Sequence, residues 1–341
     1  MLNYKHLINM TDTTGLLQFS KLDQPDPQSG YTLDDNARAL LVALFMGEDG
    51  YPYARLYSQL LSKLQGPNGS WCNLYLNDRF IHRYDSEDSI GRAFLACSAA
   101  TMCEWPDIAA NCTVMLQNAL LRIIDFTSPR GIAYSLIGLC KGRFPFLSET
   151  ALCELVNLLA ARLINLFNSN QSRDWKWFED SMTYCNGVIP QALFAAYAFN
   201  GDKKCLKVAH ESLGFLNDSL FSRGYLSIVG NEGWYTRGCK LPLWDQQPVD
   251  AASVVFACWE AYQAIGLKEY QNLAFLAHEW YWGKNINGLV LFNQETGGCY
   301  DALTREGVNL NQGAEAVLSW LLSTHLLQGR IIVRLPTEKS S

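Results

Sequence analysis

The chain has 341 residues, of which 49% are hydrophobic and 18% charged, a composition typical of a globular protein that buries a large core. Its net charge of -6 provides no basic stripe to neutralise a phosphate backbone, so we expect no nucleic-acid partner. The N-terminus lacks the basic-then-apolar pattern of a secretory signal, and no apolar run approaches the ~18 residues that span a bilayer, so we expect no membrane partner either.

Cysteine usage points to a reducing compartment. The 11 cysteines are scattered without metal-ligand spacing, and an odd number cannot all pair within one chain. Several lie inside apolar helical segments, where cysteine acts as a small hydrophobe. We therefore expect a cytoplasmic protein with no metal and no cofactor.

In chain order, the predicted helices alternate between two kinds. The first kind is amphipathic, with apolar residues at i, i+3, i+4 and i+7, and covers about 3–10, 51–65, 106–127, 148–168, 202–219 and 267–283. The second kind follows a polar turn, is rich in Ala, Gly, Ser and Cys, and covers about 35–47, 86–101, 130–142, 187–199, 249–265 and 312–327. Helices of the second kind are apolar nearly all round and must be covered on every side, which makes them the inner set.

The regular alternation predicts an all-α fold, an (α/α)6 toroid of six helical hairpins. The six polar turns are roughly 45 to 65 residues apart, a period that holds one hairpin and a loop of variable length. Several links from an outer to an inner helix are long, and these contain strand-like segments such as 66–75, 224–229 and 288–292. We therefore expect long loops and short strands at the N-terminal end of the inner helices, in one domain over 1–328 with a C-terminal tail over 329–341.

Polar and aromatic residues concentrate at this predicted mouth of the toroid. The carboxylates are Asp34, Asp35, Asp85, Glu87, Asp88, Glu179, Asp180, Asp245, Asp250, Asp301 and Glu315; the amides include Asn36, Asn186, Gln246, Gln247 and Asn311; the rings include Tyr31, Trp71, Tyr84, Trp175, Trp177, Phe178, Tyr184, Trp234, Tyr235, Trp244 and Tyr300. Carboxylates for acid/base work, amides for hydroxyl groups and rings that stack on sugar faces together indicate a carbohydrate pocket.

A purely structural interpretation accounts for part of this set. Asp and Asn before a helix are favoured N-caps, and acidic first turns complement the helix dipole. Arg38 and Arg92 follow paired acids by one turn and would tie adjacent hairpins by pairing with them. Of the five histidines, His82 alone falls in a mouth loop, which disfavours a His-based metal site or a paired-His epimerase.

Several motifs together resemble a known family. They are 30–40 (GYTLDDNARAL), 86–93 (SEDSIGRA), 177–180 (WFED), 184–186 (YCN) with 190–193 (PQAL), 245–248 (DQQP), and 297–301 (GGCYD) with 311–315 (NQGAE). This set resembles the six-hairpin glycosidase-like domain that occurs attached to bacterial glycosyltransferases and also alone. The resemblance implies an (α/α)6 barrel, a bacterial source, carbohydrate processing and a glycosyltransferase partner.

Two positions depart from that family pattern. The second motif usually has His where this chain has Ile90, and the fourth usually has Asp where this chain has Cys185. If either missing group is catalytic, this copy is altered in specificity or inactive.

The leading hypothesis is a glycoside hydrolase that acts on an oligosaccharide or glycoside. Asp88 and Asp180 are the predicted catalytic pair, with Asp35, Glu87 and Glu315 as further catalytic candidates. The predicted substrate-binding residues are Asp34, Asn36, Arg38, Arg92, Trp177, Glu179, Tyr184, Trp244, Asp245, Gln246, Gln247, Asp301 and Asn311. Among them, Arg38, Arg92, Gln247 and Asn311 would orient sugar hydroxyls, while Trp177 and Trp244 would stack on sugar rings.

Three other functions stay open on the sequence. One is a non-catalytic glycan-binding or scaffolding module that serves a glycosyltransferase. Another is a sugar epimerase or isomerase on the same toroid, which the shortage of mouth histidines disfavours. A polysaccharide lyase needs a Tyr or His base beside an Arg, and Tyr184 with Arg92 would supply that combination.

Overall fold

The structure, a computed structural model, describes residues 2–329, and within that range twelve α-helices alternate between an outer and an inner position. The outer helices are α1 (Lys5–Asn9), α3 (Tyr51–Leu64), α5 (Pro106–Ile124), α7 (Glu149–Asn170), α9 (Lys203–Leu220) and α11 (Lys268–His278). The inner helices are α2 (Leu33–Leu44), α4 (Glu87–Ala100), α6 (Pro129–Lys141), α8 (Val188–Asn200), α10 (Pro248–Ile265) and α12 (Ala314–Leu327). The predicted alternation is confirmed.

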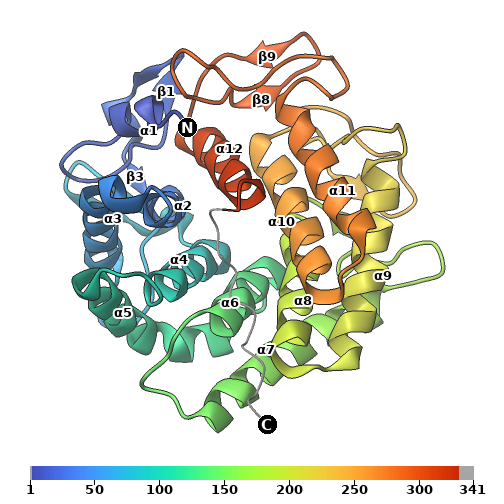
Figure 1. The fold of residues 1–341 in the computed structure, drawn as a ribbon, viewed down its shortest axis with the longest axis horizontal. Coiled ribbons are helices and arrows are strands. Elements are labelled where there is room, and N and C mark those ends of the chain that lie inside the picture. The colour runs from blue at the N-terminus through green and yellow to red at the C-terminus, as the bar shows by residue number, and fades with distance from the viewer. Residues whose placement is uncertain (1, 330–341) are drawn as a thin grey trace.

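The inner helices form a closed ring (Figure 1). Each packs against the next, from α2 to α4 and on to α12, and α12 packs back against α2. The predicted (α/α)6 toroid is therefore confirmed. Residues 330–341, most of the predicted tail, lie outside the described residues.

Small residues let the inner helices approach closely. A Cβ atom added at Gly91 of α4 would lie 2.8 Å from the carbonyl oxygen of Gly131 in α6. A Cβ added at Gly187, just before α8, would lie 2.2 Å from the carbonyl oxygen of Ser253 in α10. Any larger side chain at these two points would push neighbouring helices apart, which explains why the inner segments are rich in Gly and Ala.

Polar caps fix where several helices begin. Thr32 caps α2 by accepting a hydrogen bond from the backbone N–H of Asp35, and Ser86 caps α4 in the same way from Ser89. Ser128 caps α6, and Ser148 caps α7 as expected from the sequence. These caps place the acids of α2 and α4 in the first turn, where the helix dipole stabilises negative charge.

Short strands occupy the loops that lead into inner helices. β1 (Ser20–Lys21) pairs with β2 (Gln24–Pro25), and β3 (Tyr31–Thr32), β4 (Leu74–Leu76) and β5 (Arg79–Ile81) form a three-stranded sheet in that order. Two further antiparallel pairs are β6 (Ser181–Met182) with β7 (Tyr235–Thr236), and β8 (Ala302–Leu303) with β9 (Val308–Asn309). Long loops and short strands at the mouth are thus confirmed, although residues 224–229 form no strand and 288–292 form only isolated bridges at Val290 and Phe292.

Two helices differ from the sequence expectation. α1 has five residues, shorter than the predicted 3–10, because the chain turns into an isolated bridge between Thr11 and Leu16. Among the described helices, α7 is long and apolar enough by length and composition to cross a membrane, which the sequence analysis did not foresee because Glu154 and Arg162 interrupt the apolar run. In the structure α7 packs on α6, α8 and α9 as an outer helix of the barrel.

Candidate functional site

A polar cavity of about 410 Å³ opens at the mouth, where α2, α10 and α12 begin. We call it the mouth cavity. It is lined by Gln18, Phe19, Thr32, Asp34, Asp35, Arg38, Asn73, Asn231, Asp245, Gln247, Pro248, Asp301, Ala302, Asn309, Glu315 and Ala316. Five carboxylates from four separate stretches of chain therefore share one cavity.

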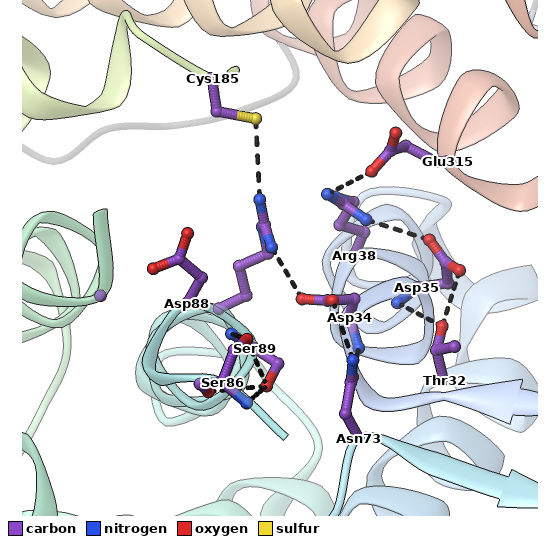
Figure 2. A network of polar contacts seen from close by, with 12 residues as sticks. Thr32, Asp34, Asp35, Arg38, Asn73, Ser86, Asp88, Ser89, Cys185 and Glu315 are labelled. Carbon is purple, nitrogen blue, oxygen red and sulfur yellow. Dashed lines mark hydrogen bonds and ion pairs between the residues drawn. The ribbon is translucent and has the colours of Figure 1, made fainter. Parts of the chain in front are cut away.

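Arg38 links the first and last hairpins across this cavity (Figure 2). Its Nη1 donates to Asp35 Oδ1 at 3.0 Å, and its Nη2 donates to Glu315 Oε2 at 2.9 Å. Arg38 and Asp35 are buried, whereas the Glu315 side chain is 45% exposed. Glu315 is therefore the carboxylate of this trio that is open to a ligand.

Burial sets the protonation of Asp35. Desolvation raises the pKa of Asp35 to about 6, against the opposing pull of the Arg38 guanidinium, and the nearby Glu315 charge adds to the rise. Asp35 also accepts a hydrogen bond from the Thr32 hydroxyl at 2.7 Å. With both neighbours bound to it, Asp35 orients Arg38.

The pKa of Asp34 is shifted in the opposite direction to that of Asp35. Burial disfavours its charge, but Arg92 and Arg38 outweigh that effect and hold the pKa of Asp34 below its ordinary value. Arg92 Nη1 donates to Asp34 Oδ1 at 2.8 Å, and the Asn73 amide lies 3.4 Å from Asp34 Oδ2 (Figure 2). Asp34 is thus ionised at the wall of the cavity, and its ion pair with Arg92 links α2 to α4.

Asp301 is the second acid with a raised pKa. It precedes β8, and its Oδ1 accepts a hydrogen bond from the backbone N–H of Gly313 at 2.6 Å. Burial raises the pKa of Asp301 to about 6, and the Glu315 charge contributes in the same direction. A carboxyl that holds its proton near pH 6 beside a second, more exposed carboxylate is the arrangement that acid/base catalysis requires.

Two more predicted residues border the cavity near the start of α10. Asp245 and Gln247 both line it, together with Asn231 from the preceding loop. Burial raises the pKa of Asp245, with the charges of Glu232 and Glu306 acting in the same sense. These groups add acceptors and an amide donor for sugar hydroxyls.

On the other side of the mouth, where α4 and α6 begin, the acids accept hydrogen bonds from neighbouring segments. Asp88 accepts from the Ser128 hydroxyl at 2.5 Å and from the Tyr184 hydroxyl, and it is 6% exposed. Glu87 Oε2 accepts from the backbone N–H groups of Thr127 and Ser128 at 2.7 and 2.5 Å, which caps the chain before α6. Neither acid lines the mouth cavity.

Arg130 holds a third acid on that side. Its guanidinium donates to Glu179 at 3.0 Å, to the Thr183 hydroxyl at 2.6 Å and to the Tyr184 carbonyl at 2.6 Å. Its charge lies 4.7 Å from the centre of the Tyr184 ring. Glu179 and Tyr184 are thereby fixed around α6 rather than directed into the mouth cavity.

Asp180 lies on the surface. Its side chain is 80% exposed and forms an ion pair with Arg237 at 3.1 Å, and it does not line the mouth cavity. The structure therefore does not bring Asp180 and Asp88 together around that cavity.

Several predicted binding residues have structural partners. Trp177 is fully buried against Phe178, so its ring offers no face to a sugar. Asn36 bonds the backbone of Leu16, and Gln246 accepts from the Trp280 indole. Asn311 accepts from the backbone N–H of Leu22 and is not among the residues that line the mouth cavity. Trp244 is half-buried and packs against the core beside the cavity residue Asp245.

Sequence reasoning missed other members of the site. Gln18, Phe19, Asn73, Asn231 and Asn309 line the mouth cavity, and they come from loops rather than from the six recurrent motifs. The Phe19 ring is 54% exposed in the structure, and no signal in the sequence marks it.

Asp250, another of the predicted mouth acids, does not line the mouth cavity. It is buried in the first turn of α10, and its Oδ1 accepts from the backbone N–H of Cys185 at 2.5 Å. Burial raises its pKa to about 7.

Both residues that depart from the family pattern are buried. The Sγ of Cys185 lies 3.7 Å from Arg92 Nη2, and Ile90 is buried in α4.

A second cavity, of about 200 Å³, lies along the axis of the ring. All six inner helices line it, mostly with apolar side chains such as Leu41, Leu95, Ile137, Phe256 and Leu322. Arg38 borders both cavities, so the polar network around Arg38 and Arg92 separates the mouth from this apolar bore.

Comparison with known proteins supports the fold. A D-mannose isomerase is 14% identical, with 96% of each chain covered and a TM-score of 0.68. A sugar epimerase from a ruminal bacterium is 10% identical, with 94% of this chain and 95% of that chain covered and a TM-score of 0.70. A GH76 α-mannanase from Bacteroides thetaiotaomicron is 12% identical, with 87% of each chain covered and a TM-score of 0.58.

These similarities define the class of fold, an (α/α)6 toroid that solved sugar-processing enzymes share. No protein-family model matches the chain, and no curated protein matches it in sequence.

Proposed function

We propose that the protein is a glycoside hydrolase that cleaves an oligosaccharide or glycoside in the mouth cavity. Asp301 donates a proton to the leaving-group oxygen, and Glu315 is the partner carboxylate that attacks the sugar or activates water. The observation that carries this proposal is the shared cavity, in which an acid with a pKa of about 6 lies beside an exposed carboxylate.

This pair replaces the pair predicted from the sequence. Asp88 accepts from Ser128 and Tyr184, and Asp180 is a surface residue paired with Arg237. Asp301 accepts one hydrogen bond from Gly313, which leaves its second oxygen for a substrate. Glu315 is held by Arg38 through one oxygen, which leaves the other for water or sugar.

The remaining cavity residues bind and orient the sugar in this proposal. Asp34, Asp245, Gln247 and Asn231 offer acceptors and donors for hydroxyl groups. Phe19 supplies an exposed ring that can stack on the apolar face of a sugar at the edge of the cavity.

The test is hydrolysis of a panel of oligosaccharides and aryl glycosides by the full chain. We expect turnover of at least one glycoside, with loss of about 100-fold or more in Asp301→Asn. Asp180→Asn is the matched control, because it removes the same charge outside the cavity. Equal turnover by Asp301→Asn and the wild type would reject the assignment of Asp301.

A sugar isomerase or epimerase is the second candidate. The similarity to D-mannose isomerase and to the sugar epimerase, with TM-scores of 0.68 and 0.70, exceeds that to the α-mannanase, at 0.58. Such an enzyme removes a proton next to a carbonyl, which a cavity carboxylate can accept. Incubation of reducing sugars in D2O distinguishes the two candidates, since deuterium at C2 without cleavage supports the isomerase or epimerase.

Sugar binding without turnover in both assays would support the non-catalytic binding module instead. A glycosyltransferase partner and a cytoplasmic location stay predictions from the sequence. Co-purification of the chain with a glycosyltransferase from its own cells would test the partner.

A further inference from the structure

A second cluster of chemically active side chains lies outside the mouth cavity, on the hairpin of β4 and β5. The thiol of Cys72, the imidazole of His82 and the carboxylate of Asp85 each offer one ligand atom, and these atoms all lie within 4.8 Å of one another. The hairpin explains why they meet. Leu74 pairs with Ile81, so the residues just before β4 and just after β5 lie side by side.

His82 and Asp85 are already paired, and the nearby Cys72 thiol donates to the Leu74 carbonyl at 3.4 Å. His82 Nδ1 lies 2.8 Å from Asp85 Oδ2, and Asp85 Oδ1 accepts from the backbone N–H of Asn73 at 2.7 Å. Among the described residues, His82 is the one basic side chain that forms an ion pair with Asp85. A carboxylate and a thiol thus share a small space that lacks a lysine or arginine partner.

Exposure differs across the cluster in a way that suits an ion entering from solvent. Cys72 is 3% exposed, the Asp85 side chain is 29% exposed and the His82 side chain is 72% exposed. Two ligands are therefore positioned by the fold. Rotation of the exposed His82 ring would close the third side around an ion.

The donor set selects one class of metal. Thiolate and imidazole ligands disfavour magnesium and calcium, which prefer oxygen, and favour zinc. One sulfur, one nitrogen and one oxygen ligand fill three of the four tetrahedral positions of zinc.

We propose that Cys72, His82 and Asp85 bind a zinc ion, with water at the fourth position. On binding, the Cys72 thiol releases its proton to solvent and coordinates as the thiolate. The zinc site shares no ligand with the residues that line the mouth cavity.

Zinc at this position would fix the rim of the mouth cavity. Asp85 holds the backbone of Asn73, and the Asn73 carbonyl accepts from the backbone N–H of Leu33 at 2.8 Å, at the start of α2. The Asn73 side chain also contacts Asp34. The ion would therefore anchor the hairpin that supports one wall of the cavity.

The test uses the full chain, freed of metal by a chelator and kept reduced by a phosphine. Titration with Co²⁺ should give one equivalent of binding with a thiolate-to-cobalt charge-transfer band, and Zn²⁺ should displace the cobalt. Cys72→Ser should abolish the band, whereas Cys239→Ser, at an exposed cysteine outside the cluster, should retain it.

Zinc affinity of the ligand variants provides the second readout. His82→Ala removes an exposed side chain, so it should fold normally by circular dichroism and weaken zinc binding by at least about tenfold. Asp85→Asn keeps an acceptor for Asn73 and should weaken binding as well. The proposal is overturned if the wild type binds no stoichiometric zinc, or if His82→Ala binds zinc as tightly as the wild type.

Discussion

The two sides of the mouth contain the same kinds of residue but use them differently. On the side of α2 and α12, Asp35, Asp301 and Glu315 line an open cavity. On the side of α4 and α6, Glu87 and Asp88 bond to the segment that starts α6. We refer to these as the open side and the clamped side.

The difference comes from the loops rather than from the recurrent motifs. On the clamped side the link between α5 and α6 is short, and Ser128 lies directly against Asp88 and Glu87. On the open side the long loops before α10 and α12 line the mouth cavity together with the start of α2. An acid in one of the recurrent motifs is therefore free for chemistry only where the neighbouring loop does not occupy its oxygens with hydrogen bonds.

The largest expected effect is on turnover at the open side. Glu315→Gln keeps the shape of the side chain but removes the charge that the proposed reaction uses, so we expect turnover to fall by about 100- to 10,000-fold. Steady-state kinetics on a cleaved glycoside measure it. Turnover within about twofold of the wild type would show that the open side is not catalytic.

The next effect is on stability at the clamped side. Arg130 is 4% exposed and donates to Glu179, Thr183 and Tyr184, so Arg130→Met leaves these partly buried acceptors without that donor. We expect a loss of about 2 to 3 kcal/mol in the free energy of unfolding. Urea denaturation measures it, and the fraction that stays folded should retain its turnover. A loss of less than about 1 kcal/mol would contradict the clamp.

The pH dependence of stability tests burial at the open side. The pKa of Asp35 and that of Asp301 are about 6 in the folded state, above the value near 3.8 that applies without burial. The folded state therefore binds more protons than the unfolded state between about pH 4 and pH 6. The free energy of unfolding should fall as pH rises through that window, by about 2 kcal/mol for each of these two acids, and Asp250, whose pKa is about 7, should continue the fall toward pH 7.

Denaturant titrations at pH 4.5 and pH 7 measure this change. Asp301→Asn should reduce the difference between the two values, since it removes one of the acids whose pKa is raised. An unchanged difference in that variant would assign the pH dependence to other groups.

The smallest effect is expected for Asp88→Asn. The amide can still accept from Ser128 or Tyr184, so we expect a loss of about 1 kcal/mol in stability and turnover close to that of the wild type. Thermal unfolding and the hydrolysis assay measure the two quantities. Collapse of turnover in a folded Asp88→Asn protein would restore Asp88 as the catalytic acid.

The fold could be predicted because its signals are periodic. The amphipathic and all-apolar helices alternate along the chain, and each observed inner helix starts within a few residues of its predicted position. The candidate site could be predicted only in part. The acids at the mouth were foreseen, including Asp34, Asp35 and Glu315.

The roles of those acids depend on contacts between distant segments, which periodicity does not encode. Asp88 and Asp301 both come from acidic motifs at the mouth, and the neighbours Ser128 and Tyr184 occupy the first but not the second. Trp177 was expected at a sugar, but the structure buries it completely, because aromatic residues in a loop layer also serve packing. Phe19 lies in a loop, and no sequence motif predicts its place in the cavity.

The closure of α12 onto α2 has a consequence for biosynthesis. Arg38 and Glu315 are 277 residues apart in sequence, and their ion pair joins the two walls of the mouth cavity. When the ribosome has synthesised the first five hairpins, the chain contains Asp34, Asp35 and Arg38 but not Glu315. The mouth cavity cannot yet be assembled at that stage. The mouth cavity therefore forms only when α12, in the last hairpin, packs against α2 and closes the ring.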